Sequence, residues 1–239
     1  MHVRHILSIP QENENSTSFT IIHEKHLTAT DTVKDEKVTG EALDSADFAK
    51  VNDIWSGLFE INDDIIGWIT VPGTTIDYPV MQTVNNVDYL NLDFYKNYSV
   101  FGTPFIDSAV TFSPKSRNTV LYGHSVNSTE HMGQLHRYLD QEFYEENKVI
   151  TFNTLYEDRV YEVISVCLVM TTGEDIIDYT RTSFFQPDSL MEYIERMISL
   201  SHITGDTSFS SNDYFLTIQT CTSIQENSKL VVLAKEIIW

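Results

Sequence analysis

The two cysteines of the sequence lie in different local patterns. Cys221 ends an alternating run of apolar and polar residues, 214–221, which is rich in aromatic and β-branched side chains and is typical of a strand. A polar loop, 222–228, follows, so the thiol is held by a rigid strand yet can reach solvent, as a reactive cysteine requires. Cys167 lies inside the apolar run 163–170, where a cysteine usually packs as a small hydrophobic residue. The patterns therefore favour Cys221 as a candidate nucleophile and Cys167 as a core residue over a disulfide between the two.

A cysteine nucleophile needs a base or a cation nearby, and histidine is the usual one. Of the eight histidines, only His124 stands where a predicted strand, 118–124, ends and a polar loop begins. The others lie in the N-terminal tail, in a helical stretch or at a helix end, and are His2, His5, His23, His26, His131, His136 and His202. A histidine at a strand end is by itself more often a structural hydrogen-bonding group than a catalyst. Together with Cys221 at another strand end, catalysis becomes the better interpretation, because both ends could open on one rim of a barrel.

The elements that must position these side chains are mostly strands. Strand patterns cover 68–71, 76–81, 101–106, 110–112, 118–124, 148–152, 159–170, 214–221 and 229–234. Helical patterns run from Asp47 to about Phe59, over 87–94 and 131–139, and after the cap 187–189, where Leu190, Ile194, Met197 and Ile198 form an apolar face. Many short strands with few helices predict a mostly β domain, a barrel or a sandwich.

Composition and charge divide the chain and exclude several functions. Residues 1–45 are polar and acidic with no sustained period, which predicts a disordered tail or linker before a folded domain over 46–239. The formal net charge of −20 argues against nucleic acid and against docking on anionic lipid. No Cys/His cluster has zinc-site spacing, so no structural zinc is expected. No apolar run is long enough to span a membrane, and 6–9 is too short for the core of a signal peptide.

The candidate nucleophile and base lie in segments that resemble a known family. The segment 217–221, TIQTC, resembles the TLxTC signature of sortases with isoleucine in place of leucine, and 121–124, LYGH, resembles their histidine segment. The resemblance extends from about Asn62 to Ile238. Three segments are similar to those of class B. They are Gly67–Trp68 leading to 76–80, then 87–91, and then 179–182 before the long helix 190–201.

This resemblance implies a fold and an activity. The fold would be an eight-stranded β-barrel with an N-terminal helix and a long helix inserted between two late strands. The activity would be that of a cysteine transpeptidase, a hydrolase or acyltransferase without cofactor or metal, which cleaves a sorting signal near the C-terminus of a surface protein. Cys221 would hold a thioacyl intermediate, and His124 would protonate the leaving amine and deprotonate the incoming one. An amine of peptidoglycan or of a pilin would resolve the intermediate, outside the membrane or in the cell wall of a Gram-positive-type bacterium.

Further site residues follow from the same resemblance. The groove for the sorting signal would be formed by Asn86, Leu90, Tyr179, Thr180, Gln219 and Thr222. Sortases carry an arginine at the start of the last strand, and Lys229 stands there in this sequence, which keeps the charge but loses the planar two-pronged donor. The N-terminal membrane anchor of the family is also absent from this chain, so that the chain is either trimmed or exported differently.

Two other interpretations stay open at this stage. The first is a sortase-like domain with weakened catalysis that serves as a binding or pilus-assembly module. Lys229 favours it, and the intact pair of Cys221 and His124 opposes it. The second is a papain-like cysteine protease, which the β-rich pattern and the lack of a Cys-Trp segment near the N-terminus oppose.

Overall fold

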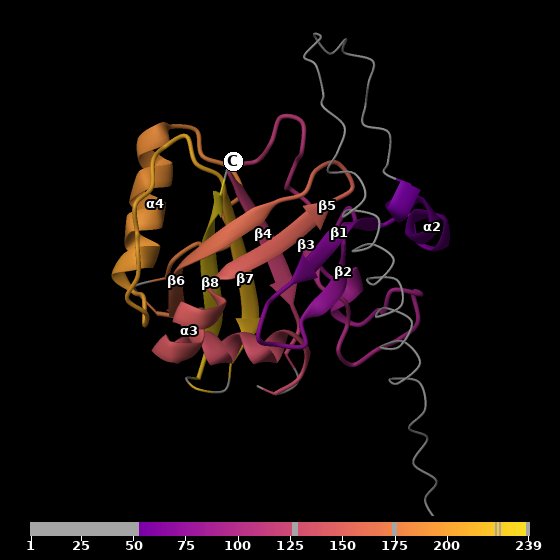
Figure 1. The fold of residues 1–239 in the computed structure, drawn as a ribbon, viewed down its shortest axis with the longest axis horizontal. Coiled ribbons are helices and arrows are strands. Elements are labelled where there is room, and N and C mark those ends of the chain that lie inside the picture. The colour runs from indigo at the N-terminus through magenta and orange to yellow at the C-terminus, as the bar shows by residue number, and fades with distance from the viewer. Residues whose placement is uncertain (1–52, 126–128, 174–175, 223, 225, 238–239) are drawn as a thin grey trace, which may run out of the picture.

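The structure is a computed structural model that describes residues 53–125, 129–173, 176–222, 224 and 226–237 (Figure 1). Its helices are α2 (Asp53–Ile61), the 3₁₀ helices η1 (Asp88–Leu90) and η2 (His131–Leu139), α3 (Gln141–Asn147) and α4 (Pro187–Ser199). Its strands are β1 (Ile65–Thr70), β2 (Asp77–Met81), β3 (Phe105–Ile106), β4 (Asn118–Gly123), β5 (Val149–Thr154), β6 (Val160–Met170), β7 (Phe215–Cys221) and β8 (Ser228–Ile237). The predicted tail, 1–45, and the predicted start of the first helix lie outside the described residues.

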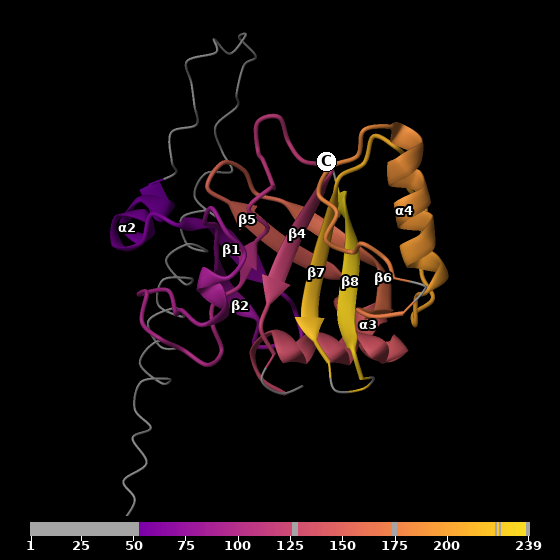
Figure 2. The same cartoon turned by 180° about the vertical axis from the view of Figure 1, so that it is seen from behind.

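The strands close into the barrel that the resemblance implies. Their order around it is β1-β2-β3-β4-β7-β8-β6-β5, and β5 pairs back to β1. Neighbours are antiparallel except β2 with β3 and β4 with β7. The mostly β fold with eight strands is therefore confirmed. Because β4 and β7 run in the same direction side by side, their C-terminal ends lie at one end of the barrel, near α3 (Figure 2).

Two apolar layers flank the sheet around β8. One fills the barrel interior, where β7 contributes Leu216 and Ile218. The other lies on the outer surface beneath α4, where β7 contributes Phe215. Strand β8 separates the layers, and every side chain from Leu230 to Ala234 is fully buried. A continuous apolar run, rather than an alternating one, follows from burial on both faces.

Helix α4 stands between β6 and β7 in the chain and covers the outer face of the barrel (Figures 1 and 2). It starts at Pro187, three residues before the predicted range, because proline suits the first turn, where its missing N–H has no partner to lose. Its buried residues Leu190, Ile194 and Met197 pack in one cluster with the outward side chains of β6 and β8. The inserted long helix is thus present, and it covers the outer face of the barrel over β6, β7 and β8.

Four local predictions differ from the structure. The helical stretch 87–94 contains only the three-residue 3₁₀ helix η1, Asp88–Leu90. Strand β3 has only two residues, because Gly102, with φ of 62°, and Pro104, which has no N–H, interrupt the predicted run. The run 110–112 forms a single isolated bridge from Phe112 to Lys115. The stretch 131–139 is helical as predicted, but it is a 3₁₀ helix.

Candidate active site

The candidate nucleophile and base lie next to each other in register. Gly123 of β4 pairs with Thr220 of β7, and each is followed by the candidate residue, His124 and Cys221. Successive side chains along a strand point to opposite faces of the sheet, and β4 and β7 run in the same direction. His124 and Cys221 therefore point to the same face of the sheet, the outer face of the barrel. Both side chains are partly exposed. The arrangement places an imidazole and a thiol at neighbouring strand ends open to solvent.

A cation completes this cluster from the third strand. Lys229 pairs with Cys221 across the β7–β8 ladder, and its Nζ donates to the Cys221 Sγ at 2.9 Å. An ammonium has three donors and no acceptor, so the sulfur accepts. None of the ion pairs between described residues involves Lys229, so its charge is directed at the sulfur.

The second cysteine lies in a different environment. Cys167 is fully buried on β6 beneath α4, and burial raises the pKa of its thiol to about 12. Both cysteines are free, so the alternative of a disulfide is not realised. A buried thiol that stays protonated packs and does not attack.

The segment before α4 brings Tyr179 to the cluster. Burial raises the pKa of the Tyr179 phenol, the charge of Lys229 opposes this, and Cys221 adds to it. The phenol therefore interacts with both groups and stays protonated at neutral pH. The Tyr193 hydroxyl of α4 donates to the Tyr179 carbonyl at 3.2 Å and holds the segment. Thr180 uses its hydroxyl locally, on Asp178 at 2.7 Å.

Gln219 lies on the outer face of the barrel, two residues before Cys221 on β7. It stands in register between Tyr122 of β4 and Val231 of β8. Its side chain is 8% exposed, and its Oε1 has no hydrogen-bond partner among the described residues. A buried acceptor without a partner is costly, so this side chain carries an energetic penalty in the structure.

Asn86 reaches this face through a hydrogen-bond chain. Its Nδ2 donates to Asp107 Oδ2 at 2.8 Å, and its Oδ1 accepts from the Ser108 N–H at 2.8 Å. Tyr122 donates to the same Asp107 oxygen at 2.6 Å. The amide of Asn86 therefore ties its loop to β4, next to Gln219. Leu90 is partly buried and packs against the barrel core.

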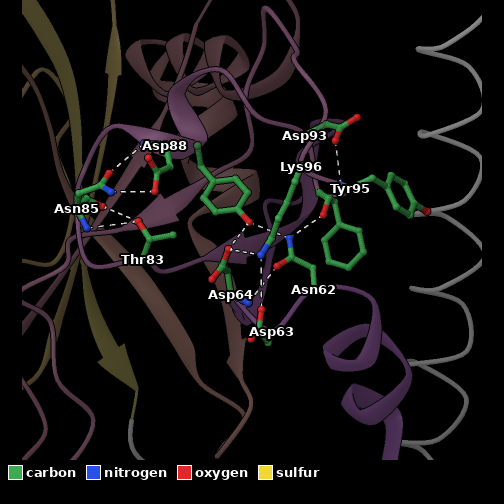
Figure 3. Close-up of polar contacts among 11 residues, drawn as sticks. Asn62, Asp63, Asp64, Thr83, Asn85, Asp88, Asp93, Tyr95 and Lys96 are labelled. Atoms are coloured by element: carbon green, nitrogen blue, oxygen red, sulfur yellow. Dashed lines mark hydrogen bonds and ion pairs between the residues drawn. The ribbon is translucent and has the colours of Figure 1, made fainter.

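The loop that carries Asn86 and Leu90 is held by a second polar network (Figure 3). The Tyr89 hydroxyl donates to Asp64 Oδ2 at 2.8 Å and accepts from Asn62 Nδ2 at 2.8 Å. Lys96 Nζ lies 3.0 Å from the same Asp64 oxygen and 3.5 Å from Asp63 Oδ1. The network fixes the 88–97 stretch to the chain just before β1, so the loop that carries Leu90 has a defined position.

Thr222 and His136 form a contact that the sequence does not reveal. His136 Nε2 lies 2.8 Å from the Thr222 hydroxyl, and its Nδ1 lies 2.7 Å from the Gly133 carbonyl. The helical pattern around His136 gave no sign of this, because the two residues are far apart in the chain. Thr222, assigned to the groove by resemblance, is thus engaged by a neighbouring element.

Arg181 lies apart from the thiol. Its guanidinium stacks on Phe184 at 4.6 Å, and its Nε donates to the Ser183 carbonyl. It borders a hollow of about 390 Å³ that residues from Ile176 to Arg181 form with α4.

Among the residues that the structure describes, no group of three His, Cys, Asp or Glu side chains could hold a metal ion. Within the same residues, no helix combines the length and the apolar character needed to cross a bilayer.

A thiol, an imidazole and a cation around one pair of strand ends of a closed barrel can carry out acyl transfer through a thioester. The family model described as Sortase domain matches residues 69–237. A curated relative, Sortase B of Staphylococcus aureus, is 35% identical over 185 residues, which are 77% of this chain and 74% of the relative. Sortase B of Listeria monocytogenes is 26% identical over 93% of this chain and 86% of its own. The chain therefore belongs to the sortase family, and its relatives place it with class B.

Solved structures of sortase B agree with this chain over three quarters of its length or more. The Staphylococcus aureus sortase B–substrate complex has a TM-score of 0.76 and 30% identity, covering 95% of this chain and 96% of its own. A sortase B complexed with triglycine has a TM-score of 0.78 and 29% identity, covering 95% and 99%. A Clostridium perfringens sortase B has a TM-score of 0.71 and 32% identity, covering 76% and 98%.

Proposed function

We propose that this sortase cleaves a C-terminal sorting signal of surface proteins through a thioacyl intermediate on Cys221. The observation that carries the proposal is the partly exposed Cys221, whose sulfur lies 2.9 Å from the Lys229 ammonium and which, like His124, directly follows the register pair of Gly123 with Thr220. A thiolate is the nucleophile in cysteine catalysis, and a neighbouring cation stabilises negative charge where the reaction develops it. The three residues supply nucleophile, acid–base group and cation.

The steps follow from these roles. The Cys221 sulfur attacks the scissile carbonyl, and Lys229 stabilises the oxyanion of the tetrahedral intermediate. His124 gives a proton to the leaving amine, which departs and leaves a thioester. An incoming amine loses its proton to His124 and attacks the thioester, which frees the thiol. Thiolate attack of this kind needs no metal.

We assign the groove to the walls around these residues. We assign Gln219 and Tyr179 to direct contact with the peptide, because Gln219 lies two residues before Cys221 on the same face of β7 and the Tyr179 phenol interacts with both Lys229 and Cys221. Asn86, Thr180 and Thr222 use their polar atoms on neighbours, so we assign them to shaping the groove. Leu90 would supply an apolar wall. Residues 46–239 would form the catalytic domain.

The partners of this chain are inferred from its relatives. One relative was solved with a substrate and another with triglycine, a peptide with a free amine. We propose a sorting-signal peptide as donor and an amine of peptidoglycan or of a pilin as acceptor. The enzyme would then act on the outer side of the membrane or in the cell wall of a Gram-positive-type bacterium.

The alternative is a sortase-like module with weakened catalysis that binds partners or assembles pili. Lys229 in place of arginine favours it, because a lysine head directs one contact where a guanidinium directs two. The Lys229–Cys221 contact opposes it, because the charge still reaches the sulfur.

Mass spectrometry of the whole chain with a peptide library tests the proposal. Peptides whose acyl part is retained on Cys221 after cleavage show both the activity and the sequence preference. The Cys221→Ala protein should form no adduct, and the Cys167→Ala protein should form the same adduct as the native chain with lower stability, because Cys167 is buried. Adducts that persist in Cys221→Ala would refute the assignment, and no adduct with any peptide would favour the binding module.

A further inference from the structure

The segment after the nucleophile leaves the β-ladder at once. Cys221 is the last residue of β7 and pairs with Lys229, whereas Thr222 lies beyond the strand. Without ladder hydrogen bonds at Thr222, contacts of its side chain help to set the position of the chain that follows the thiol. Two contacts of the Thr222 hydroxyl do so, one to His136 at 2.8 Å and one from the Ile224 N–H at 3.1 Å.

The directions of these hydrogen bonds follow from the chemistry of the groups. The Gly133 carbonyl can only accept, so His136 Nδ1 carries a proton and donates to it. In the neutral ring Nε2 is then an acceptor, and the Thr222 hydroxyl donates to it. The hydroxyl oxygen accepts from the Ile224 N–H. The hydroxyl is thus fixed by one bond in each direction.

The element that carries His136 is itself firmly held. In η2, Gln134 exchanges hydrogen bonds with Thr75, on the turn between β1 and β2. The Tyr138 hydroxyl donates to the Asn147 carbonyl at 2.8 Å, which ties η2 to α3. Four side chains and Gly133 of η2 are buried. His136 therefore extends from a fixed support.

The same element also contacts the strand of the candidate base. Met132 of η2 packs on Gly123, so closely that any side chain at position 123 would overlap it. Gly123 directly precedes His124, and Thr222 directly follows Cys221. Helix η2 therefore contacts both strand ends of the site, one through Met132 and the other through His136.

We propose that His136 is a positioning residue of this sortase, which holds the Thr222 hydroxyl and thereby sets the position of Cys221 relative to His124 and Lys229. The inference rests on the proposed function, since the position of the thiol is relevant only to an enzyme that uses it. In this role His136 contacts Thr222 and acts through its hydroxyl, and it does not contact the substrate itself.

A double-mutant cycle tests the inference in the full chain. The variants are His136→Leu, Thr222→Val and the double variant, and the readout is the single-turnover rate of acylation of Cys221 by the best library peptide. Each single variant should lose about three- to tenfold, the size expected for one hydrogen bond. The double variant should be no slower than the slower single variant, because the bond can be lost only once. The cycle also removes any direct effect of Thr222 on the substrate.

Two further variants separate positioning from general stability. In His136→Gln the amide oxygen can accept from Thr222, so this variant should keep most of the native rate. Thr171→Val is the matched control, because the Thr171 hydroxyl holds the other end of the same loop at the Asn227 carbonyl, at 2.9 Å. Its backbone N–H keeps a second bond to that carbonyl, so its acylation rate should change by less than about twofold.

The outcomes are distinct. Three results would each overturn the inference. The first is a loss of rate in the double variant equal to the product of the two single losses. The second is an equal rate for His136→Gln and His136→Leu, and the third is a melting temperature that falls in proportion to the rate. If the native chain forms no adduct with any peptide, the proposed function fails. The same variants are then compared by the rate of Cys221 alkylation with iodoacetamide. A double variant that is no slower than the slower single variant supports the positioning role. Unchanged rates, or a double loss equal to the product of the single losses, overturn it.

Discussion

At the scale of single residues, the site depends on which charge and which proton lie next to the sulfur. Lys229 donates to Cys221 from the neighbouring strand, and Tyr179 adds a protonated phenol nearby. The buried Cys167 shows what the fold does to a thiol without a neighbouring cation, since burial raises its pKa more than the Ser165 hydrogen bond lowers it. The difference between the two cysteines is one of environment, because the side chains are the same.

The first prediction at this scale concerns Lys229. Lys229→Arg should raise the rate of acylation of Cys221, because a guanidinium offers a second directed donor to the oxyanion. Lys229→Ala should lower it by about 10²-fold, since one oriented donor to an oxyanion is worth about 2.7–4 kcal/mol. Single-turnover acylation of the three proteins with one peptide measures this. Equal rates would show that Lys229 is a bystander.

The second prediction concerns His124. His124→Ala should reduce turnover by about 10²-fold or more, the contribution of a positioned acid–base group. The side chain is partly exposed at a strand end, so little packing depends on it and the melting temperature should stay near the native value. Steady-state turnover and a circular dichroism melt measure the two. A melt that collapses together with the activity would identify a structural histidine.

At the scale of elements, three strands and one 3₁₀ helix build the site. β4, β7 and β8 are neighbours in the sheet and supply His124, Cys221 and Lys229 at one end. Helix η2 packs across the ends of β4 and β7 (Figure 2). The position of η2 should therefore affect the chemistry without any of its atoms reaching the substrate.

A glycine substitution tests this dependence. Gly123→Ala introduces a Cβ that overlaps the buried side chain of Met132, so η2 or the end of β4 must move. The variant should lose about 1–3 kcal/mol of unfolding free energy, as overpacking does, and about tenfold in acylation rate. Gly57→Ala is the control, because nothing lies within 4 Å of its Cβ and alanine favours the helix.

The second substitution that completes the test is Met132→Ala in the Gly123→Ala background. The shorter side chain makes room for the new Cβ, so part of the rate and of the stability should return, minus the loss from the cavity. Chemical denaturation and the acylation assay measure both. A rate that Gly123→Ala leaves at the native level would show that the contact with η2 is irrelevant to the chemistry.

At the scale of the whole molecule, the site with its lysine belongs to a strongly acidic chain. The formal net charge is −20 over 239 residues. A field of this sign attracts cations from a distance and repels anions, mainly at low salt. An acceptor that arrives as a protonated amine is therefore favoured on approach, and water, which is neutral, is not.

This contrast gives a prediction with an internal control. Raising ionic strength from about 50 mM to about 500 mM shortens the screening length and should slow resolution of the thioacyl enzyme by a cationic amine, roughly three- to tenfold. Hydrolysis of the same intermediate should stay constant. The ratio of transfer product to hydrolysis product, measured by mass spectrometry across the salt series, reports the difference. A ratio that does not depend on salt would mean that the charge of the chain does not act on the acceptor.

The sequence alone determined the features that depend on local pattern. Alternation and apolar runs predicted most strands, and Cys221 and Cys167 were separated by where their runs end, because burial along a strand follows its own period. The order of motifs identified the family and with it the closed barrel and the inserted helix. These features need no knowledge of which distant residues touch.

The tertiary structure decided what depends on register. Only the parallel pairing of β4 with β7 places His124 beside Cys221, and only the packing of η2 on those ends brings His136 to Thr222. The roles of Gly102 and Pro104 in shortening β3 also emerged only with their neighbours in place. Such contacts join residues far apart in the chain. Local sequence propensity cannot predict them, because they form only when the barrel closes and side chains of different strands come together.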